Sequence, residues 1–245
     1  MEDKALLSTE EASGAEKAEL LIVIPAYNEA ENIERVVNHL TANFPQYDYV
    51  VVNDGSRDET AAICQRNGYN LLNLPVNLGL AGAFQAGLKY ADKYGYQYAV
   101  QLDGDGPHRP EYLESMIKKM EEGYDIVIGS RFVGEKKPFT MRMLGSNLIE
   151  MAIRFTTGVN IKDPTSGMRM FSKRMIREFA SGLNYGPEPD TVSYLIRQGA
   201  RVAEVPVIMD ERILGVSYLT PVNAMRYMLK MLISILLIQN FRKRR

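Results

Sequence analysis

Short apolar runs that alternate with helix-like segments constrain the fold of this chain more than any other feature. The apolar runs at residues 20–24, 49–52 and 98–100 and the strand-like segment 124–129 are each followed by a polar turn, and amphipathic stretches separate them. Continuous apolar runs of this length are typical of parallel strands buried on both faces. Their alternation with helices predicts a doubly wound α/β fold with a mostly parallel sheet. Because no internal repeat or linker interrupts the pattern, we expect one domain over residues 20–219.

The boundaries of the expected elements follow from where each pattern stops. We predict strands at residues 20–24 (ended by Pro25), 49–52, 69–74, from Tyr98 to Asp103, 124–129, 168–171 and 201–208. We predict helices that begin near residues 28, 58 and 110, and helices over 81–94, 141–156, 190–198 and 221–242. Acidic residues open several of these helices and glycines follow them, as is usual for helix ends.

Polar side chains follow four of the predicted strands. They are Asn28, Asp54, the pair Asp103 and Asp105, and Arg131. In open α/β sheets, ligands bind beyond the carboxyl ends of the strands. We therefore expect these residues to converge on one edge of the sheet.

The pair Asp103 and Asp105 is separated by a single glycine. Two carboxylates so close repel each other unless a cation lies between them, and hard oxygen ligands suit Mg²⁺ or Mn²⁺. A D-x-D pair arises by chance about once in a chain of this length, so the metal hypothesis depends on the neighbouring clusters.

Composition excludes several classes of protein. A net charge of −1 over 245 residues gives no support to nucleic-acid binding, and the single Cys64 excludes an internal disulfide framework or a cysteine-rich zinc site. Residues 1–19 are rich in Glu and have no apolar core, so we expect a disordered acidic tail and a cytoplasmic protein. No Gly-x-Gly-x-x-Gly pattern follows the first strand, which argues against a nicotinamide dehydrogenase.

Residues 220–245 form an expected amphipathic helix with a basic end. Asn223, Tyr227, Lys230 and Ser234 make a narrow polar stripe among apolar residues, and Arg242–Arg245 are all cationic. The charge-free stretch 231–239 is far shorter than the ~20 residues of a membrane span. We expect the helix to contact an anionic membrane surface or a small membrane protein. The alternative is that it packs on the sheet or pairs with another subunit.

Several ordered motifs together resemble those of a known enzyme family. The motifs are Pro25-Ala26-Tyr27-Asn28-Glu29, Asn53-Asp54-Gly55-Ser56-Arg57-Asp58, Asn77-Leu78-Gly79 and Asp103-Gly104-Asp105-Gly106. They resemble inverting glycosyltransferase family 2, which has the GT-A fold, a Rossmann-like α/β fold. Three further motifs resemble the polyprenyl-phosphate glycosyltransferases, the dolichol-phosphate mannosyltransferase-like group: Gly129-Ser130-Arg131-Phe132, Asp163-Pro164-Thr165-Ser166-Gly167-Met168-Arg169 and Glu204-Val205-Pro206-Val207. The likeness extends from about Leu20 to Leu219.

The resemblance implies a donor site at the first strands. Its nucleotide-binding residues would be Pro25, Tyr27, Glu29, Asp54 and Asp103, with Asp54 bonded to the base. Asp103 and Asp105 would hold the Mg²⁺ or Mn²⁺ that bridges the donor diphosphate, with Asp105 as the more direct ligand and as a catalytic residue.

The resemblance also implies an acceptor site. Arg131, Arg212 and Ser217 would bind the acceptor phosphate, for which guanidinium forks are well suited. Asp190 stands where the wider family often has a catalytic carboxylate, although helix capping is an equal alternative for it. Asp163 is a further catalytic candidate, because its family counterpart lies near the reacting phosphate.

The expected activity is that of a metal-dependent inverting glycosyltransferase. It would move a sugar from a nucleotide-sugar, favoured as UDP-linked, to a polyprenyl phosphate at the cytoplasmic face of the cell membrane, for cell-envelope glycan synthesis. One alternative acceptor is a hydroxyl of a lipid-linked saccharide, which needs a base such as Asp190. Another alternative is a catalytically silent scaffold that binds nucleotide-sugar. The sequence leaves the oligomeric state undetermined, and a homo-oligomer is one alternative.

Overall fold

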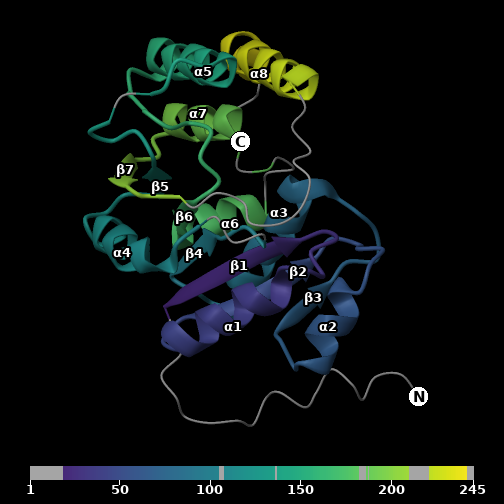
Figure 1. Ribbon diagram of the computed structural model, residues 1–245. Helices are drawn as coiled ribbons and strands as arrows, with labels where there is room; N and C mark the ends of the chain where they lie inside the picture. The colour runs from purple at the N-terminus through teal and green to yellow at the C-terminus, as the bar shows by residue number, and fades with distance from the viewer. Residues whose placement is uncertain are drawn as a thin grey trace.

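The central element is a seven-stranded sheet in the order β3-β2-β1-β4-β6-β5-β7 (Figure 1). The computed structural model describes residues 19–104, 108–135, 137–181, 186, 188–209 and 221–241. The strands are β1 (Leu20–Ala26), β2 (Asp48–Asn53), β3 (Leu71–Asn73), β4 (Tyr98–Gln101), β5 (Ile126–Ser130), β6 (Arg169–Ser172) and β7 (Val202–Pro206). Only β6 runs antiparallel, between β4 and β5. The predicted α/β fold with a mostly parallel sheet is confirmed.

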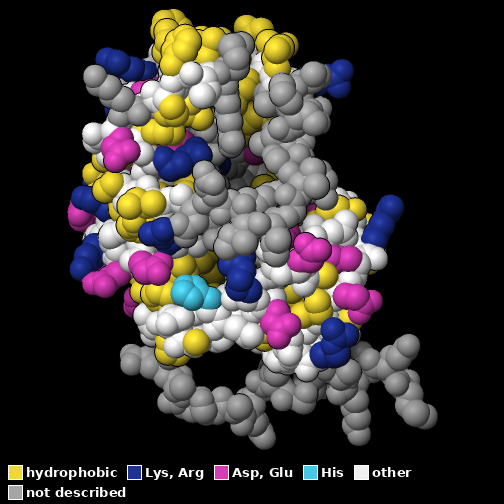
Figure 2. Space-filling model, in the orientation of Figure 1, with side chains coloured by type: hydrophobic (Ala, Val, Ile, Leu, Met, Phe, Trp, Pro, Cys, Tyr) yellow, Lys and Arg dark blue, Asp and Glu magenta, His cyan; other side chains and the backbone are white. Residues whose placement is uncertain are grey.

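Helices cover both faces of the sheet. One face packs against α1 (Ile33–Asn43), α2 (Thr60–Arg66) and α4 (Leu113–Glu121), and the other against α3 (Gly79–Tyr94), α6 (Lys173–Ser181) and α7 (Pro189–Arg197). Beyond α7 lie α5 (Met141–Thr157) and α8 (Pro221–Leu236), side by side at one end of the molecule (Figures 1 and 2). The 3-10 turns η1 (Pro110–Tyr112) and η2 (Ile238–Phe241) complete the described elements. None of the described helices is long and apolar enough to cross a membrane.

The core lies on both sides of β1. Leu20, Ile22 and Ile24 belong to the cluster beneath α1 and α4, whereas Leu21 and Val23 belong to the cluster beneath α3. This alternation is the period of two that a strand imposes on its side chains.

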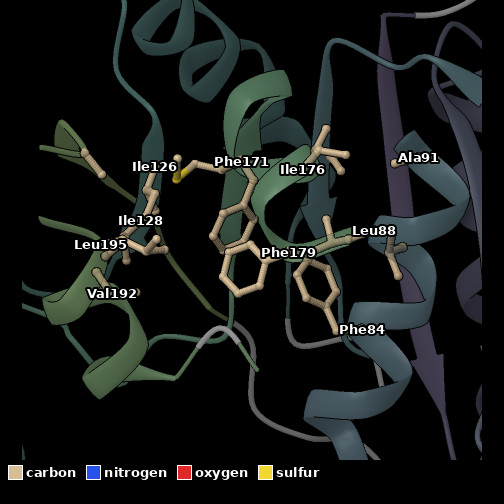
Figure 3. Close-up of a cluster of buried hydrophobic side chains, with 14 of the residues drawn as sticks. Phe84, Leu88, Ala91, Ile126, Ile128, Phe171, Ile176, Phe179, Val192 and Leu195 are labelled. Atoms are coloured by element: carbon tan, nitrogen blue, oxygen red, sulfur yellow. The ribbon is translucent and has the colours of Figure 1, made fainter. Parts of the chain in front are cut away.

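Three phenylalanines fill the centre of the second cluster (Figure 3). The ring of Phe171 on β6 lies 5.7 Å from that of Phe84 on α3 and 5.3 Å from that of Phe179 on α6. The Phe171–Phe179 pair is edge-to-face, a favoured arrangement of aromatic rings. These rings fix α3 and α6 on the sheet.

A close approach of α3 to β1 requires glycine at position 87. A Cβ atom built there would lie 2.3 Å from Cγ1 of Val23. The helix therefore packs against the middle of the strand at a distance that a larger residue would not permit without a shift.

The predicted end of β1 was wrong. The strand continues through Pro25 to Ala26, in register with β2. Pairing with β4 stops at Val23, so the missing N–H of Pro25 falls on the side where the ladder has already ended. The following helix begins at Ile33 and not near residue 28, because Asn28 adopts a left-handed backbone with φ of 56°.

Two other differences concern helices. The sequence did not predict α6, which follows β6 without any intervening turn residue and buries only Met175, Ile176 and Phe179. The last helix was predicted to reach residue 242, but α8 ends at Leu236 and η2 follows. The expected disordered tail lies outside the described residues, except for Glu19.

Candidate active site

The predicted convergence of polar residues at one sheet edge is present. The carboxyl ends of β1, β2, β4 and β5 all point to this edge, because these strands are parallel to one another. The amino end of the antiparallel β6 reaches the same edge and brings the segment 163–169 with it. Asp54, Asp103 and Arg131 therefore share an edge with Asp163 and Arg169.

The loop after β1 is held by the loop after β2. The backbone N–H of Asn28 donates to Oγ of Ser56 at 3.0 Å, and the N–H of Arg57 donates to Oδ1 of Asn28 at 2.9 Å. Asparagine tolerates the left-handed backbone found at this position better than most residues. Tyr27 and Glu29, the predicted nucleotide contacts, are placed by this turn, while Pro25 is buried within β1.

Asp58 fastens the same two loops from the other side. Its Oδ2 accepts the N–H of Ala30 at 3.1 Å and its Oδ1 accepts the N–H of Thr60 at 3.0 Å, at the start of α2. Burial raises the pKa of Asp58, but the hydrogen bonds from Thr60 and Ala30 outweigh it and leave the pKa below its ordinary value. Asp58 therefore ties the start of α2 to the loop after β1, although the N-cap residue of α2 is Glu59.

Asp54 is buried with one carboxylate oxygen engaged. Its Oδ1 accepts the N–H of Leu78 at 2.7 Å, which draws the segment 77–79 against the end of β2. Gly55 permits this contact, since its φ is +65° and a Cβ there would lie 2.8 Å from the backbone N of Asn77. No residue that the structure describes binds Oδ2, so this oxygen is available to a ligand.

Asp103 is enclosed by two neighbours. Its Oδ1 accepts Nε2 of Gln101 at 2.8 Å, and its backbone N–H donates to Nδ1 of His108 at 3.0 Å. Because Nδ1 accepts a hydrogen bond, the proton of the neutral imidazole is assigned to Nε2, which lies 3.7 Å from Oδ2 of Asp103. The side chain of His108 is 3% exposed and that of Asp103 is 32% exposed. His108 had no predicted role, although its position just beyond the Asp103 turn was visible in the sequence.

The fit of a divalent ion rests on Asp103 among the described residues. Its partly exposed Oδ2 is one hard oxygen ligand of the kind that Mg²⁺ and Mn²⁺ take. The part of the chain that the structure describes holds no group of three His, Cys, Asp or Glu arranged around a common point. The predicted ligand Asp105 and the predicted phosphate contacts Arg212 and Ser217 lie outside the described residues.

Arg131 is fixed by a fork to Asp163. Nε and Nη2 of Arg131 donate to the two carboxylate oxygens of Asp163 at 2.7 and 2.8 Å, and the backbone N–H of Arg131 donates to Oδ2 at 3.1 Å. The Asp163 side chain is 0% exposed and that of Arg131 is 26% exposed. The hydrogen bond from Asp163 raises the pKa of Arg131, against the opposing effect of burial. Asp163 thus has the geometry of a residue that positions Arg131.

Glu204 on β7 supports this fork from behind. Its carboxylate accepts the backbone N–H groups of Lys162 at 2.7 Å and Asp163 at 2.8 Å. The chain of contacts runs from β7 through the 162–163 turn to the arginine at the end of β5. Glu204 had no predicted role beyond its place in a family motif, because its partner Asp163 lies 41 residues earlier in the chain.

Arg169 is a buried cation at the centre of the edge. Nη2 donates to the carbonyl of Pro164 at 2.8 Å, while Nε has no partner among the described residues. Burial lowers the pKa of Arg169, and electrostatic interactions with Tyr227, Glu188, Asp163 and Asp103 oppose that effect. Arg169 therefore lies near the carboxylates of Asp103, Asp163 and Glu188, a position that local sequence patterns did not reveal.

Asp190 lies beneath the C-terminal helix. Its Oδ2 accepts Oγ of Ser234 at 2.6 Å, and its carbonyl accepts Nε2 of Gln239. The capping alternative was wrong in position, because Glu188 occupies the N-cap of α7 and Asp190 lies within the first turn. Whether Asp190 acts as a base stays a prediction.

A cavity of about 430 Å³ opens beside Arg131. Its lining comes from the ends of β5 and β7 and from Tyr112 of η1, and it includes one acidic residue, Glu135. Most of the lining residues are apolar, among them Phe132, Val133, Ile208 and Met209. A guanidinium at the margin of an apolar cavity suits a ligand with an anionic head and a hydrocarbon tail.

Comparison with known proteins agrees with this geometry. Residues 21–179 match the family model "Glycosyl transferase family 2". The chain is 32% identical to polyprenol monophosphomannose synthase of Mycolicibacterium smegmatis, over 86% of this chain and 84% of that protein. It is 31% identical to undecaprenyl-phosphate mannosyltransferase of Micrococcus luteus, over 81% of this chain and 86% of that protein.

A solved structure shares the fold at lower identity. Glucosyl-3-phosphoglycerate synthase of Mycobacterium tuberculosis, crystallised with Mn²⁺, uridine diphosphate and glucosyl-3-phosphoglycerate, superposes with a TM-score of 0.65. It is 20% identical, and the match covers 90% of this chain and 79% of that one. The match of the family model and the two relatives show that the chain belongs to glycosyltransferase family 2 and is a glycosyltransferase of its polyprenyl-phosphate group.

Proposed function

We propose that this glycosyltransferase moves a sugar from a UDP-sugar to a polyprenyl phosphate at the cytoplasmic face of the cell membrane, in the synthesis of cell-envelope glycans. The observation that carries the proposal is the Arg131–Asp163 fork beside an apolar cavity, on the same sheet edge as Asp54 and Asp103. A mannosyl group is the first sugar to test, because both relatives are named for mannose transfer.

The donor half of the proposal rests on Asp54 and Asp103. Asp54 keeps one carboxylate oxygen for a base N–H, which both uracil and guanine carry, so a GDP-sugar is the alternative donor. Tyr27, Glu29 and the buried Pro25 would shape the base and ribose pocket around it. Asp103 and Asp105 would hold Mg²⁺ or Mn²⁺, which when bound neutralises charge on the nucleoside diphosphate. The main chain at Gly104 lies close to β1, where a Cβ would be 3.1 Å from the carbonyl of Pro25.

The acceptor half rests on Arg131. A phosphate monoester is already anionic at neutral pH and attacks without a general base, whereas a hydroxyl needs one. Arg131 is oriented by Asp163 and Glu204, so it can meet a phosphate with little loss of side-chain freedom. Asp190 has its carboxylate bonded to Ser234 beneath α8, which favours the phosphate acceptor over the hydroxyl alternative.

Arg212 and Ser217 are proposed as further contacts to the acceptor phosphate, and Asp105 and Asp163 as catalytic-site carboxylates. In this scheme Asp163 acts through Arg131, and Asp105 acts on the donor diphosphate. Residues 220–245 are proposed as a peripheral contact with the membrane.

The test is a transfer assay on purified protein with undecaprenyl phosphate or a lipid-linked saccharide as acceptor, each with UDP- and GDP-sugars and Mn²⁺. We expect product only with the polyprenyl phosphate, and loss of product in Asp105→Asn with an unchanged melting temperature. Transfer only to the saccharide hydroxyl would establish the alternative acceptor. Absence of donor turnover with every acceptor, despite donor binding, would establish the scaffold alternative.

Arg131→Lys tests the acceptor site, with Arg174→Lys as its matched control. Arg174 makes a similar fork to Asp125, at the opposite end of β5. We expect Arg131→Lys alone to raise KM for the polyprenyl phosphate, because lysine cannot make the bidentate contact. Equal KM values in both variants would contradict the assigned role.

A further inference from the structure

We propose that the exposed apolar face shared by α5 and α8 docks on an anionic lipid bilayer. The inference deepens the proposed function, on which it rests for the place of the acceptor. It assigns half of the docking surface to α5, for which the sequence predicted no membrane contact.

One half of the face is a stripe along α5. Leu144, Leu148, Met151 and Phe155 are all exposed and follow i, i+4, i+7, i+11 spacing, so they lie on one side of the helix. Phe155 is 85% exposed at the end of the stripe. The opposite side of α5, including Ile153, is buried in the core. Both sides of this helix are therefore apolar, and only one is covered by the protein.

The other half is a stripe along α8. Met225, Leu229 and Ile233 are exposed at intervals of four residues, whereas Met231 and Ile235 are buried. The buried side attaches α8 to the same core as α5 and α7. The exposed side thus belongs to a helix whose orientation is fixed by packing.

The two stripes form one surface because the helices pack closely. A Cβ at Gly145 of α5 would lie 2.8 Å from Cγ of Met228 on α8, so glycine permits the contact. Figure 2 shows the result as apolar side chains gathered over α5 and α8, with cationic side chains at the margins. Large contiguous apolar patches on a protein surface mark sites of interaction.

The charges around the face favour an anionic bilayer. Arg154, Arg226 and Lys230 are exposed on the two helices, and the sequence continues after η2 with the cationic run 242–245. The acidic residue among the described side chains of α5 and α8 is Glu150, which is paired with Lys137 at 2.8 Å. A second copy of the chain would bring the same cations against each other, so self-association through this face is disfavoured. Each cation near an anionic membrane surface adds favourable energy to apolar insertion.

The segment that connects Arg131 to α5 supports the same occupant. Residues 132–140 lead directly from the proposed phosphate-binding arginine to the first turn of α5, and Phe139 in this connection is fully exposed. Phe139 thus adds one more exposed apolar side chain two residues before α5, on the segment that begins at Arg131.

Vesicle flotation tests the inference without any sugar donor or polyprenyl phosphate. The probes are phosphatidylcholine vesicles with and without phosphatidylglycerol. We expect binding to the anionic vesicles, reduced about tenfold or more in the double variant Met151→Gln, Leu229→Gln. In Arg154→Gln we expect a loss of about fivefold, the fold-change for roughly 1 kcal/mol per cation at an anionic surface. Leu80→Gln is the matched control, because Leu80 is 58% exposed on α3 and Leu229 is 57% exposed.

Several outcomes would overturn the inference. They are failure of the wild-type chain to bind anionic vesicles, equal binding by the double variant and the wild type, and a dimer in sedimentation that the double variant abolishes. Circular dichroism melting verifies that each variant is folded. If vesicle binding behaves as expected but no sugar reaches polyprenyl phosphate in detergent, the proposed function fails and the docking surface stands.

Discussion

Replacing Asp163 by asparagine should separate the positioning of Arg131 from the fold itself. The fork buries a carboxylate that is 0% exposed against a guanidinium whose side chain is 26% exposed. Removing one partner of a fully buried ion pair costs about 3–5 kcal/mol, because the other charge is left uncompensated. The cost should be smaller here, because asparagine keeps one acceptor oxygen and water can partly solvate the Arg131 guanidinium. We therefore expect a loss of about 2–3 kcal/mol in the free energy of unfolding. For a chain of this size that loss lowers the melting temperature by roughly 4–12 °C.

The kinetic effect should fall on the acceptor alone. A hydrogen bond to a charged group contributes about 1.5–3 kcal/mol, so a guanidinium that has lost its orientation should lower kcat/KM for the polyprenyl phosphate by about ten- to a hundredfold. KM for the nucleotide-sugar should remain within about twofold, because Asp54 and Asp103 belong to other strands.

Asp125→Asn is the matched control for this variant. Asp125 also accepts a two-pronged contact from an arginine, Arg174, but it precedes β5 and so lies at the opposite edge of the sheet. The Asp125→Asn variant should be less stable than the wild type but should have the same KM for the acceptor. An Asp163→Asn enzyme with normal acceptor kinetics, or a control with the same kinetic defect, would refute the positioning role.

Three further predictions concern stability. Gly87→Ala should destabilise by about 1–3 kcal/mol in urea unfolding because its Cβ would overlap Val23, and Val23→Ala should relieve part of the loss; simple additivity would contradict the contact. The pKa of Glu188 is raised, first by burial and then by the charge of Asp190, so the folded chain is less stable once Glu188 loses its proton as the pH rises. Glu188→Gln should therefore have a higher melting temperature than the wild type at pH 8. Below about pH 4, where Glu188 is protonated in both states, the two melting temperatures should be equal. Burial raises the pKa of Asp125, but Arg174 and the N–H of Arg201 outweigh it and lower the pKa. The ionised carboxylate of Asp125 therefore stabilises the fold above about pH 4, and this contribution is lost as the pH falls. Asp125→Asn should lower the melting temperature at pH 7 and have little effect below about pH 3.

Local patterns predicted the sheet and the polar residues that follow its strands. Buried apolar runs identify parallel strands because both faces are covered, and strand direction then places Asp54, Asp103 and Arg131 on one edge. This much requires only information within a few residues of each position, which explains why it could be derived from the sequence.

The partners of these residues could not be predicted in the same way. Arg131 meets Asp163 across 32 residues, and Asp163 meets Glu204 across 41, because an antiparallel strand is inserted between β4 and β5. Periodicity shows that a helix has an apolar side, but not whether protein or another medium covers it. For that reason the exposed stripe of α5 was not expected, while the amphipathic character of α8 was.

The bonds that Asp190 makes to Ser234 and Gln239 impose an order on the maturation of the chain. These contacts close over 44 and 49 residues, whereas the ladders among β1, β2 and β4 are complete once Gln101 has been synthesised. During synthesis the part of the edge that carries Asp54 can assemble early, whereas the partners of the buried Asp190 on α7 are synthesised much later. The proposed docking surface needs α8, which follows all seven strands in the chain, so we expect affinity for a bilayer to arise only after the sheet has formed.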